Sequence, residues 1–315
     1  MAAWLVIMPL AVLAGARLLA WDATPVLVAA NAVTPFVYLP AWPVVVLAAG
    51  LRRWGLLGTA GLVVVAHLVF VLPEVLAATA VPYNARRAPR LRLFTANVLS
   101  SNRDVHGYAE EIRHTRPDVV VLQEASPPFL AALRETGVLS ELVDTIVIPR
   151  LDPFAMVVAS RWPLTEEEIL PAQGRPVVLR VTVALPGQDV QLLAVHAMAP
   201  TSGHLKEWED DLELVRRLIV GVRRCLLVVG DFNATWGNRP FHRLLARGLT
   251  DGAAARSTPF AMTWPRNRRL MPPVVRIDHV LTGNGAVVTK IRSGRGEGSD
   301  HRPLIADIAL TGAAT

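Results

Sequence analysis

The sequence predicts an α/β fold preceded by an all-α apolar region. The first 80 residues hold only six Asp, Glu, Arg, Lys or His side chains, namely Arg17, Asp22, Arg52, Arg53, His67 and Glu74. From about residue 90, short apolar runs of strand length alternate with segments whose apolar residues recur at helical spacing. Many strands with helices between them indicate sheets covered by helices, and we expect this domain to span residues 90–312.

Three apolar stretches in the first part predict transmembrane helices, because each is near the ~20 residues that a helix needs to cross a bilayer. They lie at residues 2–20, within 24–50 and at 54–76. The middle stretch contains several prolines, so two spans with a re-entrant middle segment are the alternative. The first stretch could instead be a signal peptide, but it lacks a basic start. We expect three helices in residues 1–80 and a short linker at 81–89.

The charge balance is only weakly basic outside the apolar part. The chain has 32 Lys and Arg against 26 Asp and Glu, of which five and two precede residue 88, so 27 and 24 remain. This excess of +3 does not indicate a strongly basic nucleic-acid-binding domain. The single cysteine, Cys225, excludes an intramolecular disulfide.

The elements of the second part follow from its periodicity. We predict strands at residues 90–98, 118–124, 153–160, 177–184, 190–196, 225–230, 276–282 and 303–310. We predict helices at residues 104–115, 127–136, 204–222 and 239–247. In the third helix, Leu205, Trp208, Leu212, Val215 and Ile219 recur at helical spacing, and charged residues occupy the other faces.

Polar side chains occur at the ends of several predicted strands. They are Asn97, Glu124, His196, Asp231 with Asn233, Asp278, and Asp300 with His301. A single carboxylate at a strand end more often caps a turn, but the recurrence is difficult to explain in that way. Ligand sites in α/β proteins form where several strand ends converge, so we expect these side chains to meet.

In chain order, the motifs "TANV", "LQE", "VHA", "GDFN", "RIDHVL" and "GSDHRPL" resemble the endonuclease/exonuclease/phosphatase superfamily. That group includes DNase I, abasic-site endonucleases, neutral sphingomyelinases and inositol-polyphosphate 5-phosphatases. The resemblance covers roughly residues 90–310, and "GDFN" with "SDH" is its most specific part. It implies a DNase I-like β-sandwich flanked by helices and a metal-dependent hydrolysis of phosphoric esters.

The resemblance also implies roles for individual residues. Mg²⁺, or Mn²⁺, would be held by Asn97, Glu124 and Asp300, whose oxygen atoms suit a hard cation. The implied catalytic residues are His196, Asp231, Asn233, Asp278 and His301. Asp278 would pair with His301, while Asp231 and Asn233 would orient water and a phosphate oxygen.

His196 distinguishes branches of the superfamily. Abasic-site endonucleases carry tyrosine at this position, whereas DNase I, sphingomyelinases and phosphatases carry histidine. A cationic imidazole here would stabilise phosphoryl charge or protonate the leaving group. The acid that pairs with this histidine in DNase I has no counterpart that the sequence identifies, which leaves its protonation state open.

An arginine-rich run precedes Asp278 and contains Arg266, Arg268 and Arg269. A solvated loop is the ordinary explanation for such a run. Close to the predicted site, these side chains are also candidates for binding substrate phosphate or anionic lipid headgroups.

The apolar region narrows the choice of substrate. A domain that begins about a dozen residues after a membrane span is held near lipid substrates. We therefore expect a multi-pass cell-membrane enzyme that binds the bilayer and hydrolyses a phosphorylated lipid. The arginines flanking the spans leave the orientation open, but the layout resembles bacterial membrane proteins linked to teicoplanin resistance, which favours an extracytoplasmic domain.

Two other readings are open. An extracytoplasmic DNase I-like nuclease would bind nucleic acid with a steep salt dependence. An inactive membrane scaffold would need a broken metal or histidine site, and none of the motif residues departs from the superfamily pattern. The sequence indicates no protein partner.

Overall fold

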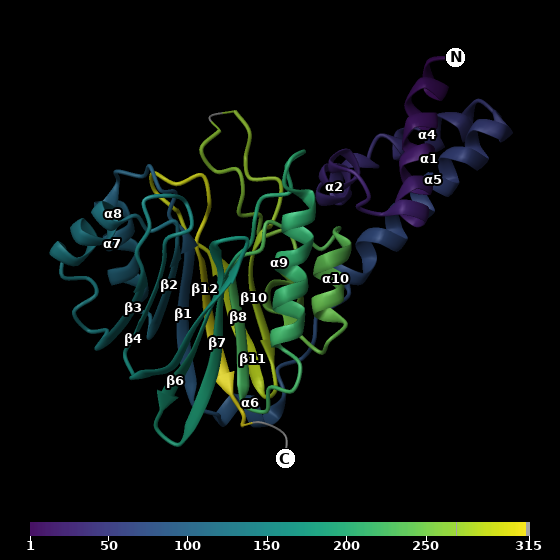
Figure 1. The fold of residues 1–315 in the computed structure, drawn as a ribbon. Coiled ribbons are helices and arrows are strands. Elements are labelled where there is room, and N and C mark those ends of the chain that lie inside the picture. Colours follow the sequence, from purple (N-terminus) through teal and green to yellow (C-terminus); the bar gives the residue numbers. More distant parts are fainter. Residues whose placement is uncertain (269, 313–315) are drawn as a thin grey trace.

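Two mixed six-stranded sheets pack face to face in the computed structural model, which describes residues 1–268 and 270–312 (Figure 1). The first sheet has the order β11-β12-β1-β2-β4-β3, and the second has the order β5-β6-β7-β8-β10-β9. The strands of the first are β1 (Arg90–Asn97), β2 (Val119–Gln123), β3 (Asp144–Ile148), β4 (Met156–Ser160), β11 (Ala286–Ser293) and β12 (Leu304–Leu310). Those of the second are β5 (Leu164–Ala172), β6 (Arg175–Leu185), β7 (Gln188–His196), β8 (Cys225–Asp231), β9 (Thr250–Asp251) and β10 (Asp278–Gly283).

The main hydrophobic core lies between the sheets. Leu93 and Val121 from the first sheet and Leu192 and Leu227 from the second belong to this one cluster and are completely buried. Every residue of β8 is buried, as its apolar sequence predicts. The predicted α/β class, with a β-sandwich flanked by helices, is therefore confirmed. The sequence analysis did not predict β3, β5, β9 or β11.

Helices cover the outer faces of both sheets. They are α7 (Val105–Thr115), α8 (Pro127–Glu135), α9 (Leu205–Leu218) and α10 (Arg239–Leu245). Two further helices are short: α6 (Tyr83–Arg87), and the buried α11 (Gly252–Ala255), whose Ala253 belongs to the core between the sheets. Trp208 of α9 is completely buried against the second sheet. The α7 helix begins where the Asp104 carboxylate accepts a hydrogen bond from the Gly107 amide at 3.0 Å.

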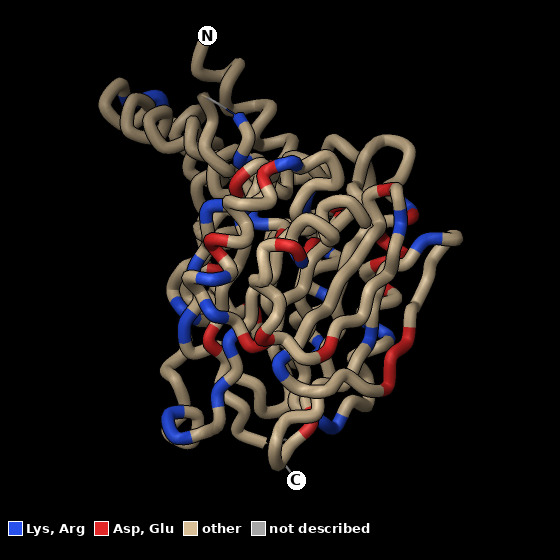
Figure 2. Tube along the Cα trace, turned by 90° about the vertical axis from the view of Figure 1, so that its left-hand side faces the viewer, with Lys and Arg blue, Asp and Glu red and all other residues tan. Residues whose placement is uncertain are grey.

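The apolar helices form a bundle that projects from the domain (Figure 1). Two of them, α1 (Ala2–Ala20) and α5 (Trp54–Val75), are long and apolar enough to cross a membrane. The middle stretch forms α2 (Pro25–Ala32), α3 (Thr34–Val37) and α4 (Ala41–Gly50), with a bend of 78° after α2. The described residues thus offer two or three spans. Figure 2 shows that charged residues are spread over the domain and sparse in the bundle.

The bundle docks directly on the domain. Val28 of α2 is buried in the same hydrophobic cluster as Trp208 of α9 and Phe241 of α10. The Trp21 indole donates a hydrogen bond to the carbonyl of Gly237 at 2.9 Å. The first residues after α1 and one face of α2 therefore lie against the domain, whereas Val26 on another face of α2 is exposed.

Candidate active site

The ends of neighbouring strands bring the predicted polar residues together. Asn97 ends β1, and Glu124 follows β2, which runs parallel to β1. His196 ends β7 opposite Asp231, which ends the parallel strand β8. The antiparallel strand β10 begins with Asp278, which also lies opposite Asp231. Both sheets therefore contribute polar side chains to one end of the sandwich.

Unusual backbone conformations occur at these strand ends. Glu124 and Asn233 have φ values of 58° and 48°, in the left-handed region that few non-glycine residues adopt. Gly230 has a φ of 129°, and a Cβ atom on it would lie 2.1 Å from the carbonyl oxygen of Val195. Only glycine fits where β8 approaches β7 so closely. Backbone strain of this kind is concentrated at functional sites.

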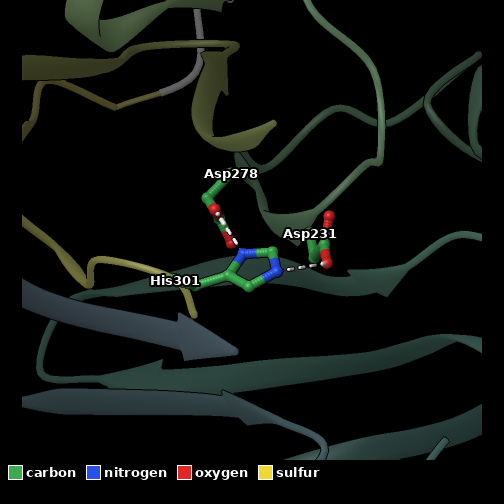
Figure 3. A group of neighbouring side chains, drawn as sticks. All are labelled: Asp231, Asp278 and His301. Atoms are coloured by element: carbon green, nitrogen blue, oxygen red, sulfur yellow. Dashed lines mark hydrogen bonds and ion pairs between the residues drawn. The ribbon is translucent and has the colours of Figure 1, made fainter. Parts of the chain in front are cut away.

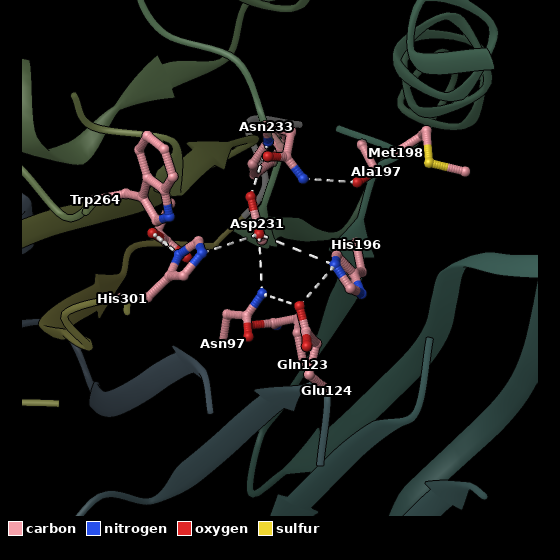
Figure 4. A network of polar contacts seen from close by, with 12 residues as sticks. Asn97, Gln123, Glu124, His196, Ala197, Met198, Asp231, Asn233, Trp264 and His301 are labelled. Atoms are coloured by element: carbon pink, nitrogen blue, oxygen red, sulfur yellow. Dashed lines mark hydrogen bonds and ion pairs between the residues drawn. The ribbon is translucent and has the colours of Figure 1, made fainter. Parts of the chain in front are cut away.

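Asn97 joins two carboxylates at the centre of the site (Figure 4). Its amide nitrogen donates to Glu124 Oε1 at 2.9 Å and to Asp231 Oδ2 at 3.1 Å. The Ser100 amide donates to the other oxygen of Glu124 at 3.0 Å. The carboxylates of Glu124 and Asp231 therefore lie close together, and the single neutral amide of Asn97 donates a hydrogen bond to each of them. Carboxylate oxygens gathered in this way fit a hard divalent cation such as Mg²⁺.

Asp231, Asp278 and His301 form a second cluster (Figure 3). His301 Nδ1 lies 2.9 Å from Asp278 Oδ2, and His301 Nε2 lies 3.8 Å from Asp231 Oδ2. Burial disfavours the charged imidazole, but the charges of Asp278 and Asp231 outweigh it and raise the pKa of His301 to about 10. The imidazole is therefore cationic at neutral pH.

Asp231 contrasts with His301, because burial has a larger effect on its pKa than the neighbouring charges. Its side chain is 1% exposed, and burial raises its pKa well above the ordinary value, although the charge of His301 opposes the rise. The amide of Asn233 donates to Asp231 Oδ1 at 2.9 Å. The Asn233 side chain donates to the carbonyl of Ala197 at 2.9 Å, which holds the segment after β8 against the segment after β7. The carboxylate is thus fixed in orientation and more basic than an exposed aspartate.

His196 lies on the other side of Asp231. Its Nε2 atom is 3.9 Å from Glu124 Oε1 and 4.0 Å from Asp231 Oδ2. Its Nδ1 atom has no hydrogen-bond partner among the described residues, and the ring of Phe154 lies 5.4 Å away between centroids. Burial lowers the pKa of His196, although the charge of Glu124 opposes this. The surroundings favour a neutral imidazole over the expected cation.

Arg175 is a contributor to this environment that the sequence analysis missed. Its guanidinium lies 4.9 Å from the centroid of the Phe154 ring, and its Nη2 atom pairs with Asp211 at 2.6 Å. The positive charge of Arg175 lowers the pKa of His196 further. Phe154 lies in the apolar run "PFAMVVAS", and Arg175 is the first residue of β6. Neither residue belongs to a motif, so no signal in the sequence indicated that they lie near His196.

Asp300 makes its side-chain hydrogen bond with a residue of another loop. Its Oδ2 atom accepts a hydrogen bond from the Trp264 indole at 3.1 Å, and no contact in the described part of the chain joins it to Asn97 or Glu124. The three residues whose ligand atoms lie within 4.8 Å of one another are instead Asp231, Asp278 and His301. The structure joins Asn97 to Glu124 by a hydrogen bond, and the charge of Asp300 acts on His301 in the neighbouring cluster.

The predicted phosphate-binding arginines differ from one another. Arg266 pairs with Glu297 at 2.5 Å, so its charge is already partly neutralised. Arg268 is exposed, and Arg269 lies outside the described residues.

Ser299, within the "GSDH" motif, was not predicted to take part. Its hydroxyl donates to the Asn97 carbonyl at 2.8 Å and accepts from the His301 amide at 3.0 Å, so it ties β1 to the histidine.

Comparisons with known proteins identify the family and support the fold. A sequence profile described as "Endonuclease/Exonuclease/phosphatase family" matches residues 94–301. Among curated proteins, no significant sequence match is found. The TDP2 structure from Caenorhabditis elegans is 16% identical with a TM-score of 0.58, and the similarity covers 70% of this chain and 74% of that one.

Two bacterial structures show the same similarity. An endonuclease/exonuclease/phosphatase structure from Beutenbergia cavernae is 22% identical with a TM-score of 0.53, covering 71% of this chain and 72% of that one. The 3′ phosphatase NExo from Neisseria, bound to a product DNA hairpin, is 20% identical with a TM-score of 0.53, covering 69% of this chain and 98% of that one. At these identities the structures establish the fold alone, and the apolar bundle lies outside the profile match.

Proposed function

Because the chain belongs to the endonuclease/exonuclease/phosphatase family, we propose that it is a membrane-anchored phosphoesterase that hydrolyses a lipid-linked phosphate or pyrophosphate. The single observation that carries the lipid substrate is the docking of the apolar bundle beside the candidate site. Trp21 contacts Gly237, only a few residues after Asp231 and Asn233 along the chain. A bilayer around the bundle would hold lipid headgroups near the polar strand ends.

The chemistry that we propose uses the residues at the strand ends. Glu124 and Asn97, with Asp300, would hold Mg²⁺ or Mn²⁺, which when bound would neutralise charge on the phosphoryl oxygens. Asp231 would orient the attacking water and accept its proton, since a raised pKa makes this carboxylate a stronger base. Asn233 would help to hold a phosphoryl oxygen.

The two histidines would have different roles. His301, cationic and held by Asp278, would donate from Nε2 to the phosphoryl group and stabilise its developing charge. His196, with its neutral imidazole and Nε2 facing the two carboxylates, would contribute a hydrogen bond and not a fixed positive charge. Arg266 and Arg268 would contact substrate phosphate or anionic headgroups from the loop before β10.

The membrane arrangement is part of the proposal. We place α1, the stretch 34–50 and α5 across the cell membrane, which makes the protein multi-pass. Arg52 and Arg53 lie between the last two spans and would face the cytoplasm, in accordance with the positive-inside rule. The domain would then be extracytoplasmic, where a lipid phosphate of the outer leaflet is within reach.

A nuclease is the second candidate. The observation in its favour is that NExo, one of the similar structures, is described as bound to a DNA hairpin. A membrane-anchored nuclease would act on DNA through a basic surface, and its rate would fall steeply with salt because phosphate contacts release counterions.

The test uses full-length protein in detergent with Mg²⁺. Undecaprenyl pyrophosphate, phospholipid vesicles and duplex DNA would be assayed in parallel with wild type, Asp231→Asn and His301→Ala. Glu213→Gln is the matched control, because it breaks an ion pair with Arg216 on α9, away from the site. Turnover of a lipid that both site variants lose would support the proposal. DNA cleavage without lipid turnover would refute the lipid substrate and favour the nuclease.

A further inference from the structure

Arg276 is a buried charge held by two parts of the chain. Its side chain is 3% exposed, and its Nη2 and Nη1 atoms pair with Glu74 at 2.6 Å and with Asp251 at 2.7 Å. Glu74 lies in the last turn of α5, and Asp251 ends β9 of the second sheet. A buried guanidinium is tolerated only when it is paired and hydrogen-bonded, so the bundle supplies half of what this arginine requires.

Arg276 stands directly before the catalytic strand β10. Asp278, two residues later, is the carboxylate that holds His301 at 2.9 Å. Between them, the carbonyl of Ile277 accepts a hydrogen bond from the amide of Phe232 at 3.0 Å, immediately after Asp231. The segment that Arg276 anchors therefore lies against both halves of the Asp231–His301–Asp278 cluster.

His279 extends the same network to the segment after β8. Its Nδ1 atom lies 2.8 Å from Arg276 Nη1, and its Nε2 atom lies 2.9 Å from the carbonyl oxygen of Ala234. The imidazole is completely buried and touches the Phe241 ring, with a centroid distance of 4.1 Å. One arginine thus connects α5 to the backbone on either side of the site.

The bundle also contacts the segment after β8 by a second route. The Asp22 carboxylate accepts from the amide of Arg239 at 2.6 Å and from the Asn238 side chain at 3.2 Å. A Cβ atom on Gly237 would lie 1.8 Å from the carbonyl oxygen of Asn31, so the backbones meet without space for a side chain. The bundle therefore fixes both segments that follow or precede catalytic carboxylates.

We infer that Glu74 is a positioning residue for the catalytic pair Asp278–His301, acting through Arg276, and that the apolar bundle is part of the active site's framework. The inference rests on the proposed function, since it concerns the same site. Glu74 touches neither Asp278 nor His301; it determines where the strand that carries Asp278 begins. Loss of the Glu74 carboxylate leaves Nη2 of the buried Arg276 guanidinium without its ion-pair partner, so that the guanidinium, and the strand start that it anchors, shift.

The experiment compares full-length wild type, Glu74→Ala, Glu74→Gln and the control Glu213→Ala in lipid nanodiscs. We expect Glu74→Ala to melt cooperatively, to lower kcat about ten- to hundredfold and to leave KM within about twofold, because misplacement of a reacting group slows the chemical step. Glu74→Gln, which keeps an oxygen acceptor for Arg276 at almost the same volume, should recover much of kcat. Glu213→Ala should match wild type.

A second readout separates this inference from the proposed function. The imidazole ¹⁵N resonances of His301, assigned with His301→Gln, should shift in Glu74→Ala and return toward wild type in Glu74→Gln. The inference would be overturned if folded Glu74→Ala had the kcat of wild type and unchanged His301 resonances. It would also be overturned if the loss of activity were no larger than the fraction of the variant that is unfolded. If wild type hydrolyses none of the substrates, the proposed function fails, and the His301 resonances still decide about Glu74. If Glu74→Ala does not fold, Glu74→Gln replaces it: loss of the charge should still lower kcat and shift the His301 resonances by a smaller amount, and a Glu74→Gln variant identical to wild type in both would overturn the inference.

Discussion

Substitution of Asp278 by Asn tests the catalytic arrangement most directly. Asn has almost the same size and can still accept a hydrogen bond from His301 Nδ1, which lies 2.9 Å from Asp278 Oδ2. The substitution removes the negative charge of Asp278. Burial lowers the pKa of His301, and this charge is the largest of the effects that nevertheless raise the pKa to about 10. Without that charge, we expect the pKa to return to about 6.5 or lower.

The size of the effect follows from the protonated fraction of His301. At about pH 8, an imidazole with a pKa of about 10 is ~99% cationic, whereas one with a pKa of about 6.5 is ~3% cationic. If the cation stabilises the phosphoryl group, Asp278→Asn should lower kcat/KM about 30-fold at about pH 8 but by less than about twofold at about pH 5.5. The ratio of wild type to variant should therefore increase as pH rises.

The assay measures hydrolysis of bis-p-nitrophenyl phosphate by full-length protein between about pH 5.5 and about pH 8.5. Glu213→Gln provides the control, because its partner Arg216 lies on α9 and the pair is largely solvated. Circular dichroism at each pH would confirm that the variant is folded. A ratio that stays constant across the pH range would refute the assignment of a cationic His301, whatever the absolute loss.

Four further predictions concern metal, packing and pH. Removal of divalent metal by EDTA should abolish hydrolysis reversibly while leaving the far-UV spectrum intact, and a cooperative loss of structure would instead make the ion a folding element. Gly230→Ala should lower the free energy of unfolding by about 1–3 kcal/mol or more. Gly203→Ala is the control, because nothing lies within 4 Å of its added Cβ atom. Equal melting temperatures for the two variants would contradict the close approach of β7 and β8. The pKa of Asp251 is lowered, because neighbouring positive charge outweighs burial, so its stabilisation is present above the unfolded value near 3.8 and is lost as pH falls below it. Asp251→Asn should accordingly flatten the acid side of the melting-temperature profile, and an unchanged acid slope would argue against a charged carboxylate. His196→Gln should lower kcat without moving the pH profile above about pH 6, because the imidazole is already neutral there; a lost ionisation in that range would show that it is charged.

The strands that the sequence predicts are those whose apolar pattern is regular. All of β8 is buried, and its apolar run shows this plainly. By contrast, β5 carries Glu166, Glu167 and Glu168 in its centre and is an edge strand whose pairing with β6 is interrupted between Thr165 and Glu168. An irregularity between Val288 and Lys290 interrupts the pairing of β11 in the same way. Where a bulge breaks the alternation, the periodicity no longer indicates a strand.

The meeting of the polar side chains at one end of the sandwich was predictable, because the ends of neighbouring strands lie side by side in a sheet. The direction in which each side chain points was not predictable. Asn97 and Glu124 meet because β1 and β2 are parallel neighbours. Asp300 instead sits in the loop before β12, and the Trp264 indole from another loop determines where its carboxylate points. Contacts between loops distant in sequence leave no periodic pattern, and the same holds for the bonds from Asp22 to the segment after β8.

The buried Arg276 also has a consequence for how the protein is made. If α5 crosses the membrane, as proposed, it would insert before β9 and β10 leave the ribosome, because it precedes them in the chain, and Glu74 would be in position when Arg276 arrives. A domain that folds before its helices have inserted would enclose Arg276 with only one of its two carboxylates. Under the proposed membrane arrangement, the domain would complete its folding only at the bilayer, and a chain that was not inserted would keep Arg276 with one carboxylate partner in place of two.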